Sequence, residues 1–319
     1  MENIELNPKQ SKHVDRIAME LVGFPHEEGR DWDKGGKDAR YRSLFGAPLL
    51  VITALWQLIK NIVDDGYEIK HLLYGLVFLK VYAKNQSIHC AIVDWPTEKE
   101  FSSRAWHIIK TLSDQLLRVI KLENRFINAP IQDPNSTEKH SLLCGDCADF
   151  HIDEPSPWNK DWYSQKFDGP ALKYFAACAI YSNNICYTTC PIPANNHEGN
   201  FLDATILMVE LPDDEPIEVD SGPTGDRRYM GPQAGMTHAI RKAKSVLRSR
   251  QETLFSFFKY FNVLDTHFHH RNTDNEVMLE NHEACFNAVA VITQVKFMLG
   301  VNTLIDTPEV ALEIKYDML

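Results

Sequence analysis

The sequence contains no apolar run that is long enough to cross a membrane. Its most apolar stretches, residues 47–59 and 72–82, are interrupted by Gln57 and Lys80 and fall short of the roughly 20 residues that a spanning helix needs. Residues 1–15 mix acids, lysine and histidine without an apolar core, so we expect no secretory signal. The sequence therefore predicts no membrane partner.

The sequence also lacks several motifs that would identify a function at once. It has no glycine-rich phosphate loop of the Walker type, no internal repeat, and no spacing typical of a Ser-His-Asp or Cys-His catalytic group. The seven cysteines are an odd number spread over a long chain, which argues against a disulfide framework. We expect reduced thiols, as in a cytosolic or nuclear protein.

The amino-acid composition is that of a folded protein that can bury a hydrophobic core. Of the 319 residues, 44% are hydrophobic and 24% are charged, which excludes fibrous and disordered classes. The net charge of -11 is unevenly divided: residues 1–140 carry 19 basic and 19 acidic side chains, whereas residues 141–319 carry 14 basic and 25 acidic ones. The division suggests two units with different roles, although acidic surfaces also serve simply to keep proteins in solution.

The first half of the chain is predicted to be helical. Apolar residues recur at helical spacing over residues 49–59, 72–81 and 97–120. Thr97 can cap the third helix, with Glu100 three residues later. This order of helices resembles a helix-turn-helix, with Lys99–Arg118 as the candidate recognition helix. Because the net charge of this half is near zero, a purely structural bundle is the alternative.

After a linker over residues 127–140, the sequence takes on the period of strands. We expect a strand over 144–153, a hairpin of 174–181 and 185–190, a short helix over 202–209, a strand over 216–220, and helices over 235–261 and 283–299. Strands that come first, with helices mixed in later, are typical of an α/β sheet. The predicted fold class is α/β, with an all-helical domain over residues 1–130 followed by a mixed-sheet domain over residues 131–319.

Three acidic residues of the second domain are candidate site residues. Asp146 lies on the otherwise apolar face of its strand, where a carboxylate is costly unless it is paired or binds a metal; a register shifted by one residue is the alternative. Asp220 ends a short strand and is expected at the carboxyl edge of a sheet. Glu252 follows Arg248 by four residues on the next helix, a spacing that by itself indicates a surface ion pair. As a set, the three acids indicate a site for two Mg²⁺ or Mn²⁺ ions.

The same region resembles a known family in four ordered segments. They are GDCADFHIDEPSPWNKDWYSQKFDGPALKY from residue 145, IEVDSG from 217, RSRQETLFSFFKYFNVL from 248 and HEACFNAVAVITQ from 282. These segments resemble the catalytic domain of DDE transposases of the PIF/Harbinger group, also called DDE superfamily endonucleases, which has an RNase H-like fold. Upstream, HLLYGLVFLKVYA, EKEFSSRAW and ENRF resemble the helical region of these proteins, so the resemblance begins near Tyr41.

The resemblance implies a function and a set of site residues. It assigns Asp146, Asp220 and Glu252 as a catalytic triad that binds two Mg²⁺ or Mn²⁺ ions, with 73 residues between the first two and 31 between the last two, and it gives Asp203 a supporting role. The implied activity is cleavage of DNA phosphodiesters and joining of strands in the nucleus. A Myb-like partner would share DNA recognition, and a homo-oligomer is left open. Phosphate contacts are expected from four basic residues of the catalytic helix: Arg241, Lys244, Arg248 and Arg250.

The sequence departs from the family pattern beside two of the three acids. After the second acid, where the family commonly has a pattern like DGGY, this chain has Ser221, Gly222 and Pro223. Around the third acid, where the family has His, Asn and Arg, this chain has Gln251, Phe255 and Phe257. The alternative function is therefore a catalytically silent, domesticated relative that binds DNA or a protein partner. A hydrolase of small phosphate esters is a third hypothesis.

Two further clusters are candidates for metal binding. One is a four-thiolate zinc site of Cys144, Cys147, Cys186 and Cys190. Residues three apart on one strand point to opposite faces, which argues against this site. The other cluster is His267, His269 and His270, for which a surface group of histidines is the simpler interpretation.

Overall fold

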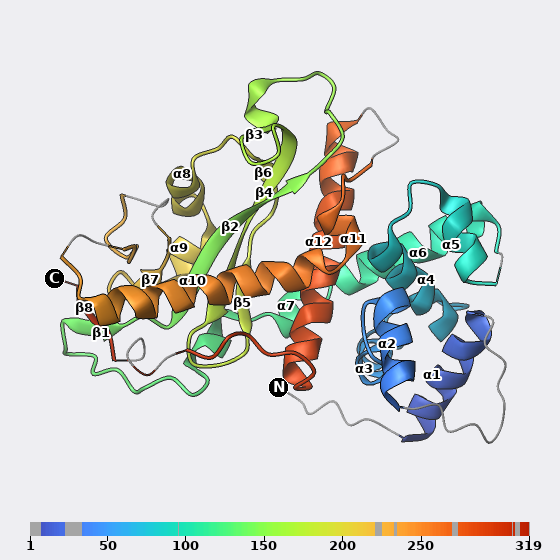
Figure 1. Cartoon of the computed structure of the whole chain (residues 1–319), viewed down its shortest axis with the longest axis horizontal. Coiled ribbons are helices and arrows are strands. Elements are labelled where there is room, and N and C mark those ends of the chain that lie inside the picture. The colour runs from blue at the N-terminus through green and yellow to red at the C-terminus, as the bar shows by residue number, and fades with distance from the viewer. Residues whose placement is uncertain are drawn as a thin grey trace. The chain divides into compact units, whose positions relative to one another are not determined.

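The computed structural model describes residues 8–22, 34–94, 96–220, 225–232, 235–269, 274–307, 309 and 313–318 (Figure 1). The chain divides into two compact units. The helical unit comprises Met1–Val119, Phe258–His269 and Glu280–Leu299, and the sheet unit comprises Ile120–Phe257, His270–Leu279 and Gly300–Leu319.

The boundaries of these two units differ from the domain boundary at residue 130 that the sequence predicts. Residues 258–269 and 280–299, which that division assigns to the mixed-sheet domain, belong to the helical unit. The physical reason is aromatic packing, since the ring of Phe258 meets that of Phe286 edge-on with 5.3 Å between centroids. Phe261 is fully buried in the same unit. Apolar periodicity shows that a helix has a buried face, but it carries no information about which core that face joins.

The helical unit is built around one central helix, α4 (Ile69–Val81). The other helices are α1 (Pro8–Leu21), α2 (Lys34–Phe45), α3 (Leu49–Ile59), α5 (Gln86–Ile92), α6 (Glu98–Ser113), α7 (Leu116–Val119), α11 (Asn262–Asp265) and α12 (Asn275–Met298), which belongs to this unit from Glu280 onward. Helix α4 contacts α1, α2, α6 and α11. Its residues from His71 to Leu79 are all buried, because apolar side chains surround the whole circumference of the helix.

The helix ends of this unit test the capping predictions. The predicted cap at Thr97 is confirmed, because its hydroxyl accepts a 3.2 Å hydrogen bond from the backbone N–H of Glu100. Helix α4 begins earlier than predicted, at Ile69, because Glu68 and His71 each accept a hydrogen bond from the other's backbone in a capping box. The helix predicted over residues 97–120 is divided into α6 and α7.

Two buried histidines make the helical unit sensitive to acid. Burial lowers the pKa of His71 and that of His89 to about 4. Each imidazole also accepts a backbone hydrogen bond, His71 from Glu68 and His89 from Ala83, and a protonated ring nitrogen cannot accept. The folded state therefore keeps both rings neutral where the unfolded chain, with a His pKa near 6.5, already binds protons.

We expect the free energy of unfolding to fall as the pH drops from 6.5 towards 4. Each histidine contributes at most roughly 3 kcal/mol to this loss. The measurement is urea denaturation followed between about pH 7.5 and about pH 5. His89→Gln should weaken the pH dependence, whereas substitution of the exposed His13 should leave it unchanged. An identical pH dependence in the His89→Gln protein would contradict this explanation.

The sheet unit has a mixed α/β architecture. Its main sheet contains β2 (Leu143–His151), β3 (Tyr163–Ser164), β4 (Gly169–Ala179), β5 (Ile185–Thr188), β6 (Ile192–Pro193) and β7 (Ile217–Glu218). The strand order is β3-β4-β2-β7, and β5 and β6 also pair with β4. Strand β2 is antiparallel to β4 and parallel to β7, so the sheet is mixed, as predicted. A separate antiparallel pair joins β1 (Glu138–His140) to β8 (Lys315–Asp317).

Helices cover both faces of the main sheet. They are η1 (Leu122–Phe126), η2 (Lys160–Trp162), α8 (Glu198–Asp203), α9 (Ile206–Glu210) and α10 (His238–Lys259). On one face, α10 runs across β2, where the Phe255 and Phe150 rings lie 6.4 Å apart (Figure 1). On the other face, Phe175 of β4 packs in an apolar cluster with Leu202 of α8 and Leu207 of α9. The strands predicted in this half are present, but β7 has only two residues. The helix predicted over residues 202–209 is divided into α8 and α9, and β1 lies within the predicted linker.

Among the described residues, no single helix is both long enough and apolar enough to cross a membrane. One pair, Asp38–Phe45 with Leu49–Ile59, meets the criteria of length and composition only when its two helices, bent by 51°, are taken together.

Candidate functional site

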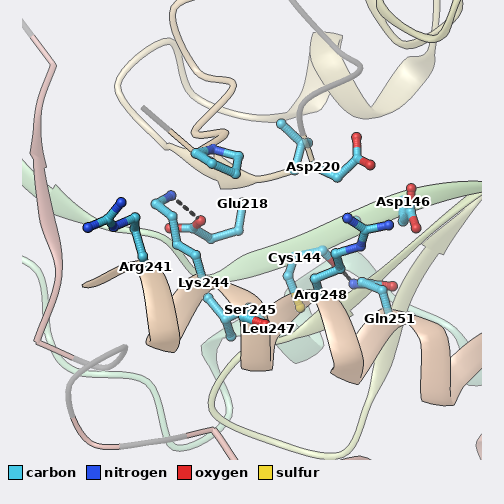
Figure 2. A pocket seen from close by; sticks show the side chains of 13 residues that line it. Cys144, Asp146, Glu218, Asp220, Arg241, Lys244, Ser245, Leu247, Arg248 and Gln251 are labelled. Atoms are coloured by element: carbon cyan, nitrogen blue, oxygen red, sulfur yellow. Dashed lines mark hydrogen bonds and ion pairs between the residues drawn. The ribbon is translucent and has the colours of Figure 1, made fainter. Parts of the chain in front are cut away.

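A cavity of about 270 Å³ lies in the sheet unit where β2 and β7 meet α10 (Figure 2). It is lined by Cys144, Gly145 and Asp146 of β2, by Glu218, Val219 and Asp220 at the end of β7, by Pro232, and by Arg241, Lys244, Ser245, Leu247, Arg248 and Gln251 of α10. Two of the three predicted acids, Asp146 and Asp220, therefore share one cavity.

The strand register explains why these two acids are neighbours. In the parallel pair of β2 and β7, Cys144 is the register partner of Glu218. Asp146 lies two residues after Cys144 on β2, and Asp220 lies two residues after Glu218, just beyond the end of β7. The two carboxylates therefore come from neighbouring segments of the sheet and lie close to each other, as Figure 2 shows.

The electrostatics of Asp146 reflect this arrangement. Burial raises the pKa of Asp146 to about 7, and the negative charge of Asp220 adds to the rise. The opposing contributions are a 2.7 Å hydrogen bond from the backbone N–H of Cys147 and the positive charge of Arg248. Near neutral pH, Asp146 is therefore poised between its charged and neutral forms, and a nearby cation would favour the charged form.

A further acid, Glu198 in the first turn of α8, belongs to the same electrostatic group. Burial raises its pKa, and the charges of Asp220 and Asp149 raise it further against the influence of Lys173. Lys173 lies 3.9 Å from the Glu198 carboxylate. Sequence reasoning missed this residue, because nothing along the chain places the start of α8 near β2. Its position ahead of a predicted short helix was the one available signal.

Glu252 is arranged differently from the other two predicted acids. Its side chain is 60% exposed and forms an ion pair with Arg248 at 3.3 Å. It does not line the cavity that holds Asp146 and Asp220. All three acids are described, yet their oxygens do not all lie within 4.8 Å of one another, the spacing of a ready-made cation site. The structure thus brings two of the predicted triad together and leaves the third on the exposed side of α10.

The four basic residues predicted to contact phosphate fall into two classes. Arg241 and Arg248 line the cavity. Lys244 also lines it, but its ammonium group is buried and engaged, donating to the Glu218 carboxylate at 2.6 Å and to a backbone carbonyl. Arg250 is buried as well and donates to the backbone carbonyls of Ala179, Ser182 and Ile305. Arg241 and Arg248 therefore remain as candidate phosphate contacts, whereas Lys244 and Arg250 hold the fold together.

The structure also places the remaining candidates. The carboxylate of Asp203 accepts a 2.7 Å hydrogen bond from the Tyr229 hydroxyl and so ties α8 to the segment beside β7. The described cysteines contain no four-thiolate group, because Cys144 contacts Cys178 rather than Cys147. The rings of His267 and His269 lie 5.2 Å apart, a pair of potential metal ligands in the helical unit. The remaining predicted positions lie outside the described residues: Ser221, Gly222, Pro223 and His270.

Comparison of the chain with protein-family models, with curated proteins and with solved structures gives no match. The interpretation of the site therefore rests on its own residues and geometry.

Proposed function

We propose that the sheet unit is a divalent-cation-dependent DNA nuclease of the DDE type, with an RNase H-like arrangement of its sheet. The mixed sheet supports this proposal, because its long central strand β2 pairs antiparallel with β4 and parallel with β7. The first three family-like segments begin on β2, β7 and α10 of this unit, whereas the fourth lies on the part of α12 that belongs to the helical unit. A domain of this kind acts on DNA in the nucleus, and a Myb-like partner would supply sequence recognition.

The observation that carries the proposal is the juxtaposition of Asp146 and Asp220 in one cavity. Two carboxylates on adjacent strands repel each other, which raises the pKa of Asp146 above that of an isolated, equally buried carboxyl group. Proteins tolerate such a pair where it serves function, and carboxylate oxygens are the preferred ligands of Mg²⁺ and Mn²⁺. The residues therefore fit a divalent cation held by Asp146 and Asp220.

The chain's own residues have definable roles in such a reaction. The cation would act as a Lewis acid on the phosphodiester. Arg241 and Arg248 would bind the phosphate oxygens on the α10 side of the cavity. Asp146, whose pKa burial raises to about 7, would give up its proton when it binds the cation. Glu252 would have to separate from Arg248 before its carboxylate could join the other two.

A second candidate function is that of a catalytically silent factor that binds DNA or a protein. The position of Glu252 favours it, since an exposed carboxylate in an ion pair is also what a surface residue without a catalytic role looks like. The two candidates share the fold and the cavity, so an activity measurement has to separate them.

The test uses the purified full-length protein, supercoiled DNA and Mn²⁺. A nuclease should nick the DNA with Mn²⁺ or Mg²⁺ and lose this activity in EDTA, and calorimetry should detect Mn²⁺ binding to the protein. Asp220→Asn is the control for a contaminating nuclease, because its preparation should not nick. DNA binding without nicking, and without Mn²⁺ binding, would support the silent factor. Absence of both DNA binding and nicking would contradict the nuclease and the DNA-binding form of the silent factor.

A further inference from the structure

Cys144 and Cys178 lie opposite each other on neighbouring antiparallel strands. They are register partners in the pairing of β2 with β4, and their Sγ atoms are 3.5 Å apart. Both are free thiols, and both are buried. Opposite residues of an antiparallel pair have Cβ atoms roughly 4.5–5.5 Å apart, and a disulfide needs roughly 3.5–4.5 Å. A disulfide between them therefore requires side-chain rotation and a small approach of the strands, without a change of register.

The surroundings of the two sulfurs are unequal. Burial alone would raise the pKa of Cys178, but a hydrogen bond from Cys144 and the positive charge of Arg250 outweigh it and lower this pKa. The side-chain amide of Gln251 donates a further hydrogen bond, of 3.2 Å, to the Cys178 sulfur. Arg250 and Gln251 therefore favour the thiolate form at the Cys178 sulfur.

The cavity described above gives a small oxidant a route to the pair. Cys144 of β2 and Gln251 of α10 both line it, as Figure 2 shows, whereas Cys178 does not. An oxidant therefore reaches the Cys178 sulfur past the Cys144 sulfur, which is 3.5 Å away. A volume of about 270 Å³ holds several molecules the size of water, each of which occupies roughly 30 Å³ in the liquid. Hydrogen peroxide is scarcely larger than water and can enter, whereas a tripeptide disulfide such as oxidised glutathione exceeds the space.

We propose that Cys144 and Cys178 form a peroxide-sensitive dithiol site that closes to a disulfide. The Cys178 thiolate attacks one peroxide oxygen, the O–O bond breaks, and hydroxide leaves as water after taking up a proton. Cys178 is then a sulfenic acid. The Cys144 sulfur attacks the sulfenic sulfur while its proton passes to the departing oxygen, so the S–O bond breaks and a second water leaves. Two thiols are oxidised and one peroxide is reduced to two waters. The site is independent of any nuclease activity.

The test treats the folded, full-length protein with stoichiometric hydrogen peroxide, blocks the remaining thiols, and maps disulfides by mass spectrometry of peptides. We expect a disulfide between Cys144 and Cys178, formed at least about tenfold faster than Cys285 is oxidised, since Cys285 is buried and burial raises its pKa. Oxidised glutathione at the same concentration should not produce the disulfide.

Two variants sharpen the test. Cys144→Ser should stop the reaction at the sulfenic acid of Cys178, which a dimedone-type reagent traps. Cys285→Ser, a buried cysteine of the helical unit, should form the disulfide at the rate of the unmodified protein. The proposal is overturned if Cys178 pairs with Cys186, if the exposed Cys190 is oxidised first, or if the disulfide appears only after unfolding in urea. Mapping of the unmodified protein decides this whether or not a variant folds.

Discussion

Asp146→Asn is expected to reduce Mn²⁺-dependent nicking by at least about 100-fold and, in the same protein, to leave the melting temperature unchanged or higher. Activity should fall because Asn offers a neutral amide where the proposed site needs a carboxylate. Stability should not fall, because the substitution removes a buried charge that Asp220 opposes. Nicking assays and thermal denaturation of the same preparations provide the two measurements.

The matched control for Asp146→Asn is Asp149→Asn. Asp149 lies on the same strand and its carboxylate accepts a hydrogen bond from the Ser164 hydroxyl at 2.5 Å, but it does not line the cavity. Its substitution should leave nicking within a few-fold of the unmodified rate. Equal activity of the Asp146→Asn protein and the unmodified protein would remove the basis of the nuclease proposal.

Glu252→Gln tests whether Glu252 takes part in the nicking reaction. If Glu252 joins the cation site during the reaction, this variant should lose activity to the same extent as Asp146→Asn. If Glu252 only pairs with Arg248 on the surface, nicking should persist. In both cases the stability change should stay below about 1 kcal/mol, as is usual for exposed pairs.

The sequence predicted the site best where local rules decide the structure. Strand alternation placed Asp146 among apolar neighbours, and the short strand before Asp220 was expected to end at the edge of a sheet. The parallel pairing of Cys144 with Glu218 brings these two acids side by side. This pairing joins segments more than 70 residues apart, so neither period nor composition could have supplied the register.

The basic residues of α10 show where sequence reasoning stops. Four residues, all of the same charge, occupy neighbouring positions on this helix, and nothing in the sequence separates them: Arg241, Lys244, Arg248 and Arg250. The structure buries Lys244 against Glu218 and Arg250 against backbone carbonyls, which leaves the other two at the cavity. Whether each basic side chain is buried or reaches the cavity depends on the residues that pack against that side of the helix. Those residues are remote in sequence.

The buried ion pair of Arg125 with Glu215 holds the start of the β7 segment, and Glu215→Ala is expected to cost about 3–5 kcal/mol of unfolding free energy. The guanidinium donates two hydrogen bonds to the carboxylate, at 2.7 and 3.1 Å, and both side chains are less than a tenth exposed. Removal of the carboxylate leaves a buried positive charge without its counterion. Urea denaturation of the full-length protein measures the loss.

Two further variants distinguish the loss of a buried ion pair from the loss of an exposed one. Glu252→Ala breaks an exposed pair in the same unit and should cost at most about 1 kcal/mol. The double variant Arg125→Met with Glu215→Leu removes both charges and should recover most of the loss, because a buried charge then no longer lacks a partner. Equal effects of Glu215→Ala and Glu252→Ala would contradict the argument. Since Glu215 lies two residues before β7, weakening this pair should also loosen the segment that leads through β7 to Asp220. Glu215→Ala should therefore lower Mn²⁺-dependent nicking although Glu215 does not line the cavity.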